Sequence, residues 1–183
     1  MSIGMTRGTV YLEEHQLKWE LAAEDTIQTI KRLLGDTVVD VQHIGSTSIK
    51  TIPAKPIIDI AVAVNDYEAV LQKKNVLEKE QIIFRFDERP EQLLFVIGDF
   101  EQDTRTHHIH VVLYDSKEWN DYINFRDYLN THEHSALRYA ALKRELAQKY
   151  PNDRTAYTEG KSELIAELLT HAAEWRNNRR REA

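Results

Sequence analysis

The 183-residue sequence contains no cysteine, and it has only 6 glycines and 4 prolines. The absence of cysteine excludes disulfide bonds, thiolate metal sites and cysteine nucleophiles. The chain also lacks a Pro/Gly-rich linker, internal repeats and low-complexity tracts. Its length is sufficient for one substantial hydrophobic core, so we expect residues 1–183 to form a single domain.

Long hydrophobic runs are absent as well. No apolar stretch approaches the length of a membrane-spanning helix, and the start Met1-Ser2-Ile3-Gly4 has no signal-peptide core. The formal net charge of −6 makes attraction of the whole molecule to nucleic acid unexpected. We therefore expect a cytoplasmic globular protein whose partner is neither a membrane nor a nucleic acid.

Hydrophobic patterning predicts a fold of the α/β (α+β) class. Apolar residues near helical spacing predict a first helix over residues 13–34, with Leu17, Leu21, Ile27 and Ile30 on its buried face. Strands are predicted at 37–42, 57–64, 82–86, 93–97 and 108–114. Further helices are predicted at 66–79, 116–129, from 131 or 135 to before 151, and from 153 or 155 to about 176. This order favours one mixed β-sheet flanked by helices, followed by a helical C-terminal third.

Asp59 is a candidate functional residue because it interrupts the apolar run 57–64. An unpaired buried carboxylate is costly, so its side chain should face a cleft, a metal ion or a cation. Side chains alternate along a strand, which places Asp59 on one face with Ala61 and Ala63. We expect these small side chains to leave room for a ligand.

Two histidines on the last predicted strand are candidate metal ligands. His108 and His110 are two residues apart, so they share a strand face and can reach a common ion or phosphate. Taken alone, this pattern is more typical of a polar surface strip or a hydrogen-bonded pair in the core. Together with Asp59 it is compatible with a metal site of two histidines and one carboxylate.

The turn Gly45-Ser46-Thr47-Ser48 follows the first predicted strand. Its glycine allows the backbone to approach a ligand, and the following amides and hydroxyls can hold phosphate oxygens. The turn lacks the Walker A pattern, so it does not indicate a P-loop. An ordinary strand-to-helix connection explains it equally well. His43, which precedes the turn, is expected to hydrogen-bond the backbone there.

Four basic residues are candidate phosphate ligands. Lys143 and Lys161 each lie four residues after a tyrosine, on the same helical face, so each ammonium group can extend past a ring toward a cleft. Extension to solvent is the alternative for both. Lys55 precedes Asp59 and Arg105 precedes the histidine strand, and for each of them a solvated surface charge is the alternative.

Together these motifs resemble the GrpB family. The resemblance rests on the segments His43-Ile44-Gly45-Ser46-Thr47-Ser48, Ala54-Lys55-Pro56-Ile57-Ile58-Asp59-Ile60, His108-Ile109-His110-Val111 and Phe125-Arg126-Asp127-Tyr128-Leu129, and on Tyr139, Leu142-Lys143, Tyr157 and Lys161. It extends from about Val10 to Trp175. That family resembles the nucleotidyltransferase superfamily, in which a Gly-Ser turn holds a nucleoside triphosphate and two acids separated by one residue hold divalent metal. The resemblance implies a nucleotidyltransferase-like fold, Asp59 as catalytic residue, and Mg²⁺ or Mn²⁺ rather than Zn²⁺ as the metal.

The sequence departs from the superfamily pattern at Ala61, which occupies the position of the second acid, and from the family at Lys50-Thr51, where Pro-Gly is common. Magnesium can still be bound through one carboxylate with substrate phosphates and waters, so the loss affects catalysis more than nucleotide binding. The leading interpretation is a nucleotidyltransferase-like protein that binds a nucleotide or another phosphorylated metabolite. The alternatives are an inactive nucleotide-binding or regulatory module, and a metal-dependent enzyme that uses Asp59, His108 and His110.

Overall fold

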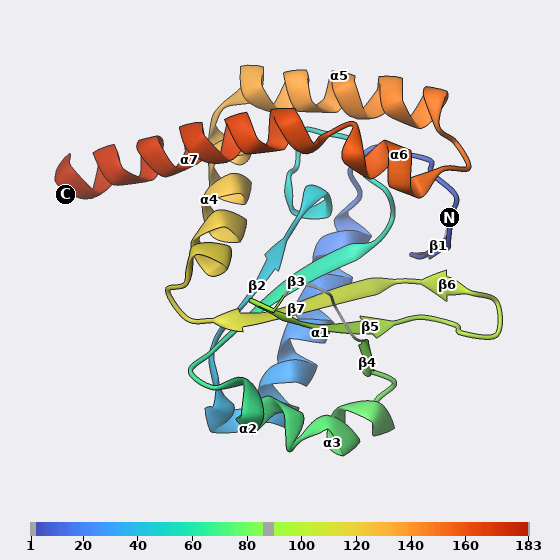
Figure 1. Ribbon diagram of the computed structural model, residues 1–183, viewed down its shortest axis with the longest axis vertical. Helices are drawn as coiled ribbons and strands as arrows, with labels where there is room; N and C mark the ends of the chain where they lie inside the picture. The colour runs from blue at the N-terminus through green and yellow to red at the C-terminus, as the bar shows by residue number, and fades with distance from the viewer. Residues whose placement is uncertain (1–2, 86–89, 183) are drawn as a thin grey trace.

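A five-stranded mixed sheet forms the centre of the computed structural model, which describes residues 3–85 and 90–182 (Figure 1). The strand order is β2 (Val38–Ile44), β3 (Ile58–Val64), β7 (His107–Leu113), β5 (Leu93–Ile97) and β4 (Ile83–Arg85). Neighbours β3 and β7 are parallel, whereas the other neighbouring pairs are antiparallel. The expected mixed sheet is confirmed. Phe86, at the end of the predicted strand 82–86, lies outside the described residues.

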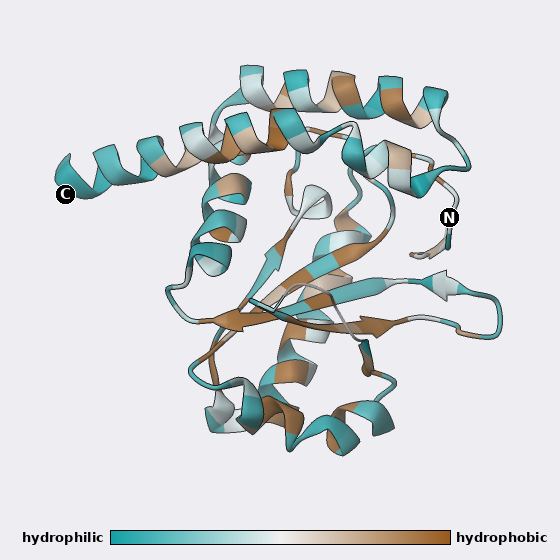
Figure 2. Cartoon of the chain, viewed as in Figure 1, coloured by the Kyte–Doolittle hydropathy of each residue, from teal (hydrophilic) through white to brown (hydrophobic). Residues whose placement is uncertain are grey.

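One face of the sheet is covered by α1 (Leu17–Leu34). Trp19, Ala23, Ile27 and Ile30 of this helix are buried in the main core. The sheet contributes six side chains to this core, those of Ile58, Ile60, Val62, Val64, Ile109 and Val111. Figure 2 shows the same division, with hydrophobic residues concentrated in the central strands and a hydrophilic C-terminal end on the last helix.

The predicted inward face of α1 is wrong at its N-terminal end, because Leu17 and Leu21 are 66% and 60% exposed. At about 100° per residue, Trp19 and Ala23 lie within about 20° of Ile30, whereas Leu17 and Leu21 lie about 140° and 180° from it. Trp19, at 0% exposure, takes the place in the core instead. The helix also begins later than predicted, because Glu13 forms an isolated β-bridge with Ala54.

The other face of the sheet is covered by α4 (Lys117–Thr131). Ser116 caps this helix by accepting a hydrogen bond from the backbone N–H of Trp119 at 3.2 Å. Trp119 packs in one cluster with Ala61 and Ala63. The space beside these alanines is therefore filled by a helix, which corrects the expectation that a ligand occupies it.

The C-terminal third is helical, with α5 (Glu133–Lys149), α6 (Arg154–Glu159) and α7 (Ser162–Glu182). Together with α4, α5 and α7 enclose a second hydrophobic core, and the last turns of α7 extend beyond the rest of the molecule (Figure 1). The predicted single helix from 153 or 155 onward is broken at Gly160 and Lys161. Gly160 lies so close to α5 that a Cβ there would be 2.7 Å from Leu146 Cδ2.

Smaller elements complete the fold. The predicted helix 66–79 is divided into α2 (Tyr67–Leu71) and α3 (Lys74–Lys79), because Lys73 leaves the helical conformation with ψ at 4°. A two-stranded sheet of β1 (Met5–Thr6) and β6 (Thr104–Arg105) was not predicted, since two-residue strands carry no periodic signal. Within the described ranges, none of the helices has the length and apolar character needed to cross a membrane.

Candidate functional site

The candidate site lies where β2 ends and where β3 and β7 begin. In the sheet register, Ile44 pairs with Asp59, and Asp59 pairs with His108. Because β2 is antiparallel to β3 and β7 is parallel to it, the turn after β2 meets the starts of both other strands at one edge. In the sequence, His108 lies 49 residues after Asp59 and 64 residues after Ile44. The register of the three strands brings these residues together.

Asp59, His108 and His110 converge at this edge. The Asp59 Oδ1 atom lies 3.2 Å from His108 Nδ1 and 3.7 Å from His110 Nε2. One ligand atom from each residue lies within 4.8 Å of the other two. Burial alone would raise the pKa of the Asp59 carboxyl, but the hydrogen bond with His108 and the nearby His110 imidazole oppose this and hold the pKa well below its usual range. The three side chains thus form a group that could hold a metal ion.

The donor set of this group restricts which metal it fits. Magnesium prefers oxygen ligands, whereas two imidazole nitrogens with one carboxylate oxygen suit manganese, iron or zinc. Of the two metals that the resemblance implies, Mn²⁺ therefore fits Asp59, His108 and His110 better than Mg²⁺ does.

The Gly-Ser turn is closed over Asp59. Gly45 has φ at +69°, and a Cβ on it would lie 2.5 Å from Asp59 Oδ2, so a side chain has no space there. The turn continues into η2 (Ser46–Ser48), where Ser48 Oγ donates to Gly45 O at 2.6 Å. Thr47 is also buried. The hydroxyls of Thr47 and Ser48 are consequently directed into the turn, whereas Gly45 and Ser46 line a cavity.

His43 supports the turn through a side chain rather than through the backbone. Its Nε2 atom is hydrogen-bonded to Thr47 Oγ1 at 2.9 Å, which corrects the expected backbone bond. Burial lowers the pKa of His43 to about 4, although Asp59 opposes the shift. At neutral pH the imidazole is therefore uncharged and acts as a fixed hydrogen-bonding group.

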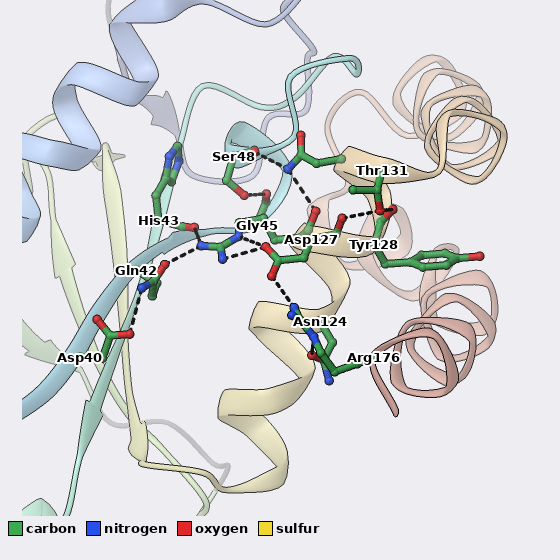
Figure 3. Close-up of polar contacts among 12 residues, drawn as sticks. Asp40, Gln42, His43, Gly45, Ser48, Asn124, Asp127, Tyr128, Thr131 and Arg176 are labelled. Carbon is green, nitrogen blue, oxygen red and sulfur yellow. Dashed lines mark hydrogen bonds and ion pairs between the residues drawn. The ribbon is translucent and has the colours of Figure 1, made fainter. Parts of the chain in front are cut away.

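Polar contacts attach the end of β2 to α4 and α7 (Figure 3). Arg126 Nη1 donates to Gln42 Oε1 at 2.8 Å and to the carbonyl oxygen of His43 at 3.0 Å. Asp127 accepts from Arg126 Nε at 2.8 Å and forms an ion pair with Arg176 of α7. Within the segment 125–129, which resembles the GrpB family, Arg126 and Asp127 thus have a structural role, since they attach β2 to α4 and α7.

Asn130 completes this attachment. Its Nδ2 atom donates to the carbonyl oxygen of Ser48 at 3.0 Å, and its Oδ1 atom accepts from the backbone N–H of Lys50 at 3.1 Å. The departure at Lys50-Thr51 therefore leaves a backbone that is still held by α4. Both ends of the turn are fixed by one helix.

A cavity of about 260 Å³ opens beside the turn. Three cations, Lys55, Arg154 and Lys161, line it together with Asp59. Its remaining lining residues are Gly45, Ser46, Ile57, His108, Phe125, Tyr139, Tyr157 and Thr158. The excess of positive charge makes the cavity suitable for an anion.

Two lysines of the cavity share one aromatic ring. The Nζ atoms of Lys55 and Lys161 lie 5.2 Å and 4.4 Å from the centroid of Tyr157. Burial lowers the pKa of each lysine to about 8, and the neighbouring Arg154 adds to the shift in both. An anion in the cavity would relieve the repulsion among these cations.

Lys143 lies near this group but does not line the cavity. It is 1% exposed, and its Nζ atom is 4.7 Å from the centroid of the Tyr139 ring. Among residues 3–85 and 90–182, that Nζ atom has no hydrogen-bond partner. Burial, followed by the charges of Lys161 and Lys55, holds the pKa of Lys143 well below its usual range.

Of the other predicted phosphate ligands, Arg105 lies outside the cavity lining. It pairs with Asp103 at 3.1 Å, and its guanidinium lies 4.6 Å from the centroid of Phe100. A phosphate-binding role for Arg105, Thr47 and Ser48 stays a prediction. Arg154 was missed by the sequence reasoning.

A signal for Arg154 does exist in the sequence. It lies three and four residues before Tyr157 and Thr158, at a spacing that places all three on one side of a helix. All three line the cavity.

Comparisons with known proteins identify the family of this chain. The family model described as GrpB protein matches residues 9–171. The Glutamate-rich protein GrpB of Alkalihalophilus pseudofirmus is 37% identical over 170 residues, which cover 91% of this chain and 98% of that protein. The UPF0157 protein YqkA of Bacillus subtilis is 31% identical, over 88% of this chain and 47% of that protein.

Solved structures give the same result for the fold. The crystal structure of conserved protein GrpB from Enterococcus faecalis matches with a TM-score of 0.83 and 30% identity, over 90% of this chain and 98% of that chain. The Cid1 poly(U) polymerase bound to MgGTP matches with a TM-score of 0.51 and 15% identity, over 75% of this chain and 44% of that chain, which shows a nucleotidyltransferase-like fold alone. On the family match and these relatives, the chain belongs to the GrpB family.

Proposed function

We propose that this protein binds a nucleoside triphosphate together with a divalent metal ion and transfers its nucleotidyl group to an acceptor. The observation that carries the proposal is the convergence of a Gly-Ser turn, a carboxylate with two histidines, and three cations on one cavity. The MgGTP-bound poly(U) polymerase of the same fold supports the choice of nucleotide.

Each part of the cavity has a distinct task in this proposal. Gly45 and Ser46 bring the backbone to the phosphate nearest to Asp59, where the absence of a side chain allows close approach. Lys55, Arg154 and Lys161 bind the outer phosphates and stabilise the negative charge that collects on the departing pyrophosphate.

Asp59, His108 and His110 would hold the metal ion, and the donor set favours Mn²⁺ over Mg²⁺. A bound divalent cation supplies charge neutralisation at the phosphate oxygens. The chain contributes to this by fixing the carboxylate, since His108 hydrogen-bonds one oxygen of Asp59 and the His110 imidazole lies 3.7 Å from the same atom.

Thermal unfolding tests the proposal directly. Nucleoside triphosphates with Mg²⁺ or Mn²⁺ should raise the melting temperature, because a ligand that binds only the folded state stabilises it. Asp59→Asn should remove the metal-dependent part of the shift, whereas Asp25→Asn, an exposed position on α1, should keep it. A complete nucleotide panel that produces no shift in the wild-type protein would reject the proposal.

A second candidate function, a nucleotide-binding module without catalysis, is favoured by Ala61. Its side chain is fully buried beside Trp119 at the position of the second acid. If a missing metal ligand costs about 4 kcal/mol in the transition state, the rate falls about a thousandfold. Pyrophosphate release from a bound triphosphate distinguishes the two functions, since the module binds the nucleotide with no release above background.

The trio Asp59, His108 and His110 also favours a further alternative, a metal-dependent enzyme that does not use a nucleotide. Such an enzyme would show a metal-dependent rise in melting temperature that no triphosphate increases further.

A further inference from the structure

A second cavity of about 280 Å³ adjoins the first. The two share Gly45 and Phe125 as lining residues, so they meet at the turn that closes over Asp59. The second cavity lies among α4, the start of α7 and the residues before β5. Its other lining residues are Glu91, Gln92, Glu118, Asp121, Tyr122, Ile165 and Leu169.

The two cavities differ in the sign of their charges. The basic residues Lys55, Arg154 and Lys161 line the first, whereas the charged residues that line the second are all acidic. Asp121 is paired with Lys117 at 2.5 Å. Glu118 also lines the cavity, and among residues 3–85 and 90–182 its carboxylate has no ion pair or side-chain hydrogen bond, although the charge of Lys117 lies near it.

Apart from the acidic residues, Gly45 and Gln92, the walls of the second cavity are hydrophobic and aromatic. Phe125, Tyr122, Ile165 and Leu169 provide these walls. An ammonium group is attracted both to a carboxylate and to the face of an aromatic ring. An apolar body with a positively charged head therefore matches this cavity, and a phosphate does not.

The second cavity is also connected to the candidate metal ligands. The hydroxyl of Tyr122 donates to Gln92 Oε1 at 2.9 Å and lies 3.4 Å from His110 Nδ1. The opposite nitrogen of His110 lies 3.7 Å from Asp59 Oδ1. A group held between Tyr122 and Gly45 is thus beside the reacting end of the first cavity.

We infer that the second cavity binds the acceptor substrate, and that this acceptor is a small cationic amphiphile carrying a hydroxyl group, with its ammonium group at Glu118. The inference rests on the proposed function for the role of acceptor. The hydroxyl oxygen forms a bond to the α-phosphorus, and the bond from that phosphorus to the pyrophosphate oxygen breaks. Pyrophosphate leaves with the electron pair, and the hydroxyl proton passes to water.

Three probes that differ in head-group charge test the binding step without nucleotide. They are 2-phenylethylamine, 2-phenylethanol and 3-phenylpropionate, titrated into the full chain and followed by NMR. The amine should bind about threefold to tenfold more tightly than the alcohol, and the carboxylate most weakly. Because no nucleotide is added, this result is independent of the triphosphate test of the proposed function.

Matched variants locate the site. Glu118→Gln should bring the affinity for the amine to that for the alcohol, whereas Glu68→Gln, an exposed glutamate on α2, should leave the preference intact. Leu169→Trp, which fills the cavity, should weaken binding of amine and alcohol alike. Equal affinities for amine and alcohol in the wild-type protein, a preference for the carboxylate, or amine binding that survives Leu169→Trp would each overturn the inference.

Discussion

Gly45 and Asp59 are in such close contact that the absence of a side chain on one determines the position of the other. A Cβ at residue 45 would lie 2.5 Å from Asp59 Oδ2 and 2.9 Å from Asp59 Cβ. The same glycine has φ at +69°, a conformation that other residues rarely adopt. The shape of the turn and the position of the Asp59 carboxylate therefore both depend on residue 45 having no side chain.

Gly45→Ala is expected to lower the free energy of unfolding by about 2–4 kcal/mol, because it combines backbone strain with a steric clash. Urea denaturation measures the loss. Gly8→Ala is the control, since Gly8 also has positive φ, at +92°, but an added Cβ would meet nothing within 4 Å. Equal losses in the two variants would mean that the contact with Asp59 contributes nothing.

Ala61→Asp introduces the second acid of the superfamily pattern into a buried apolar cluster. In the presence of a chelator the variant should be less stable than the wild-type protein by about 2–3 kcal/mol. Mn²⁺ should raise its melting temperature more than that of the wild type, because residue 61 pairs in register with His110.

Ala63→Asp is the matched control for this variant. It places the same charge on the same face, in register with Val112 and farther from Asp59. It should lose stability without recovery by Mn²⁺. Recovery of both variants, or of neither, would contradict a metal site at Asp59.

His108→Ala and His110→Ala should each reduce metal binding strongly, whereas His107→Ala should not. His107 hydrogen-bonds Thr106 Oγ1 at 2.9 Å and is not part of the group with Asp59. Mn²⁺ and Zn²⁺ titrations followed by calorimetry give the affinities, and removal of a ligand should weaken them at least about tenfold. Equal metal affinities in all three variants would assign the histidine pair a purely structural role.

Lys143→Met should raise the free energy of unfolding by about 1–2 kcal/mol, because a buried amine without a partner is replaced by an apolar group of similar length. Lys149→Met is the control, since Lys149 contacts a tyrosine ring at 5.2 Å on the same helix but is exposed. A Lys143→Met variant less stable than the wild-type protein would contradict this expectation.

Affinity for inorganic tripolyphosphate should fall as the pH rises from 7 to 9. Burial lowers the pKa of Lys55 and Lys161 to about 8, so both lose their charge across this range. We expect roughly a tenfold loss of affinity by isothermal titration calorimetry. In Lys161→Met the dependence on pH should be shallower, and an unchanged slope would contradict the assignment.

The stability of the ligand-free protein should change with pH in the opposite sense. Between the folded-state pKa of about 8 and the ordinary value of 10.5, the unfolded chain binds more protons than the folded chain at Lys55 and Lys161. This contribution to the free energy of unfolding therefore rises with pH through that window. Denaturation of the wild type and of Lys161→Met at several pH values measures it.

The strands and the candidate metal group could be predicted from the sequence because both follow a period of two. Alternation alone placed His108 and His110 on one face, and the structure brings that face to Asp59. Helical faces were predicted less well. Leu17 and Leu21 are spaced as residues on one helix face are, but that face is exposed and differs from the face that carries the buried residues of α1.

The cavity could be predicted only in part, because its walls come from elements that no local pattern brings together. Arg154 reaches the site through the packing of α6, and the sequence shows only that it shares a face with Tyr157. The helix break at Lys161 depends on how closely Gly160 approaches Leu146. Neither the position of Arg154 nor the approach of Gly160 to Leu146 produces a periodic pattern in the sequence.

The separation of the cavity walls along the chain has a consequence for biosynthesis. Gly45 and Asp59 are synthesised before Arg154 and Lys161, which follow them in the sequence. A nascent chain that already has the turn and the carboxylate thus still lacks two of the three cations. A nascent chain therefore acquires all three cavity cations only after residue 161 has been synthesised.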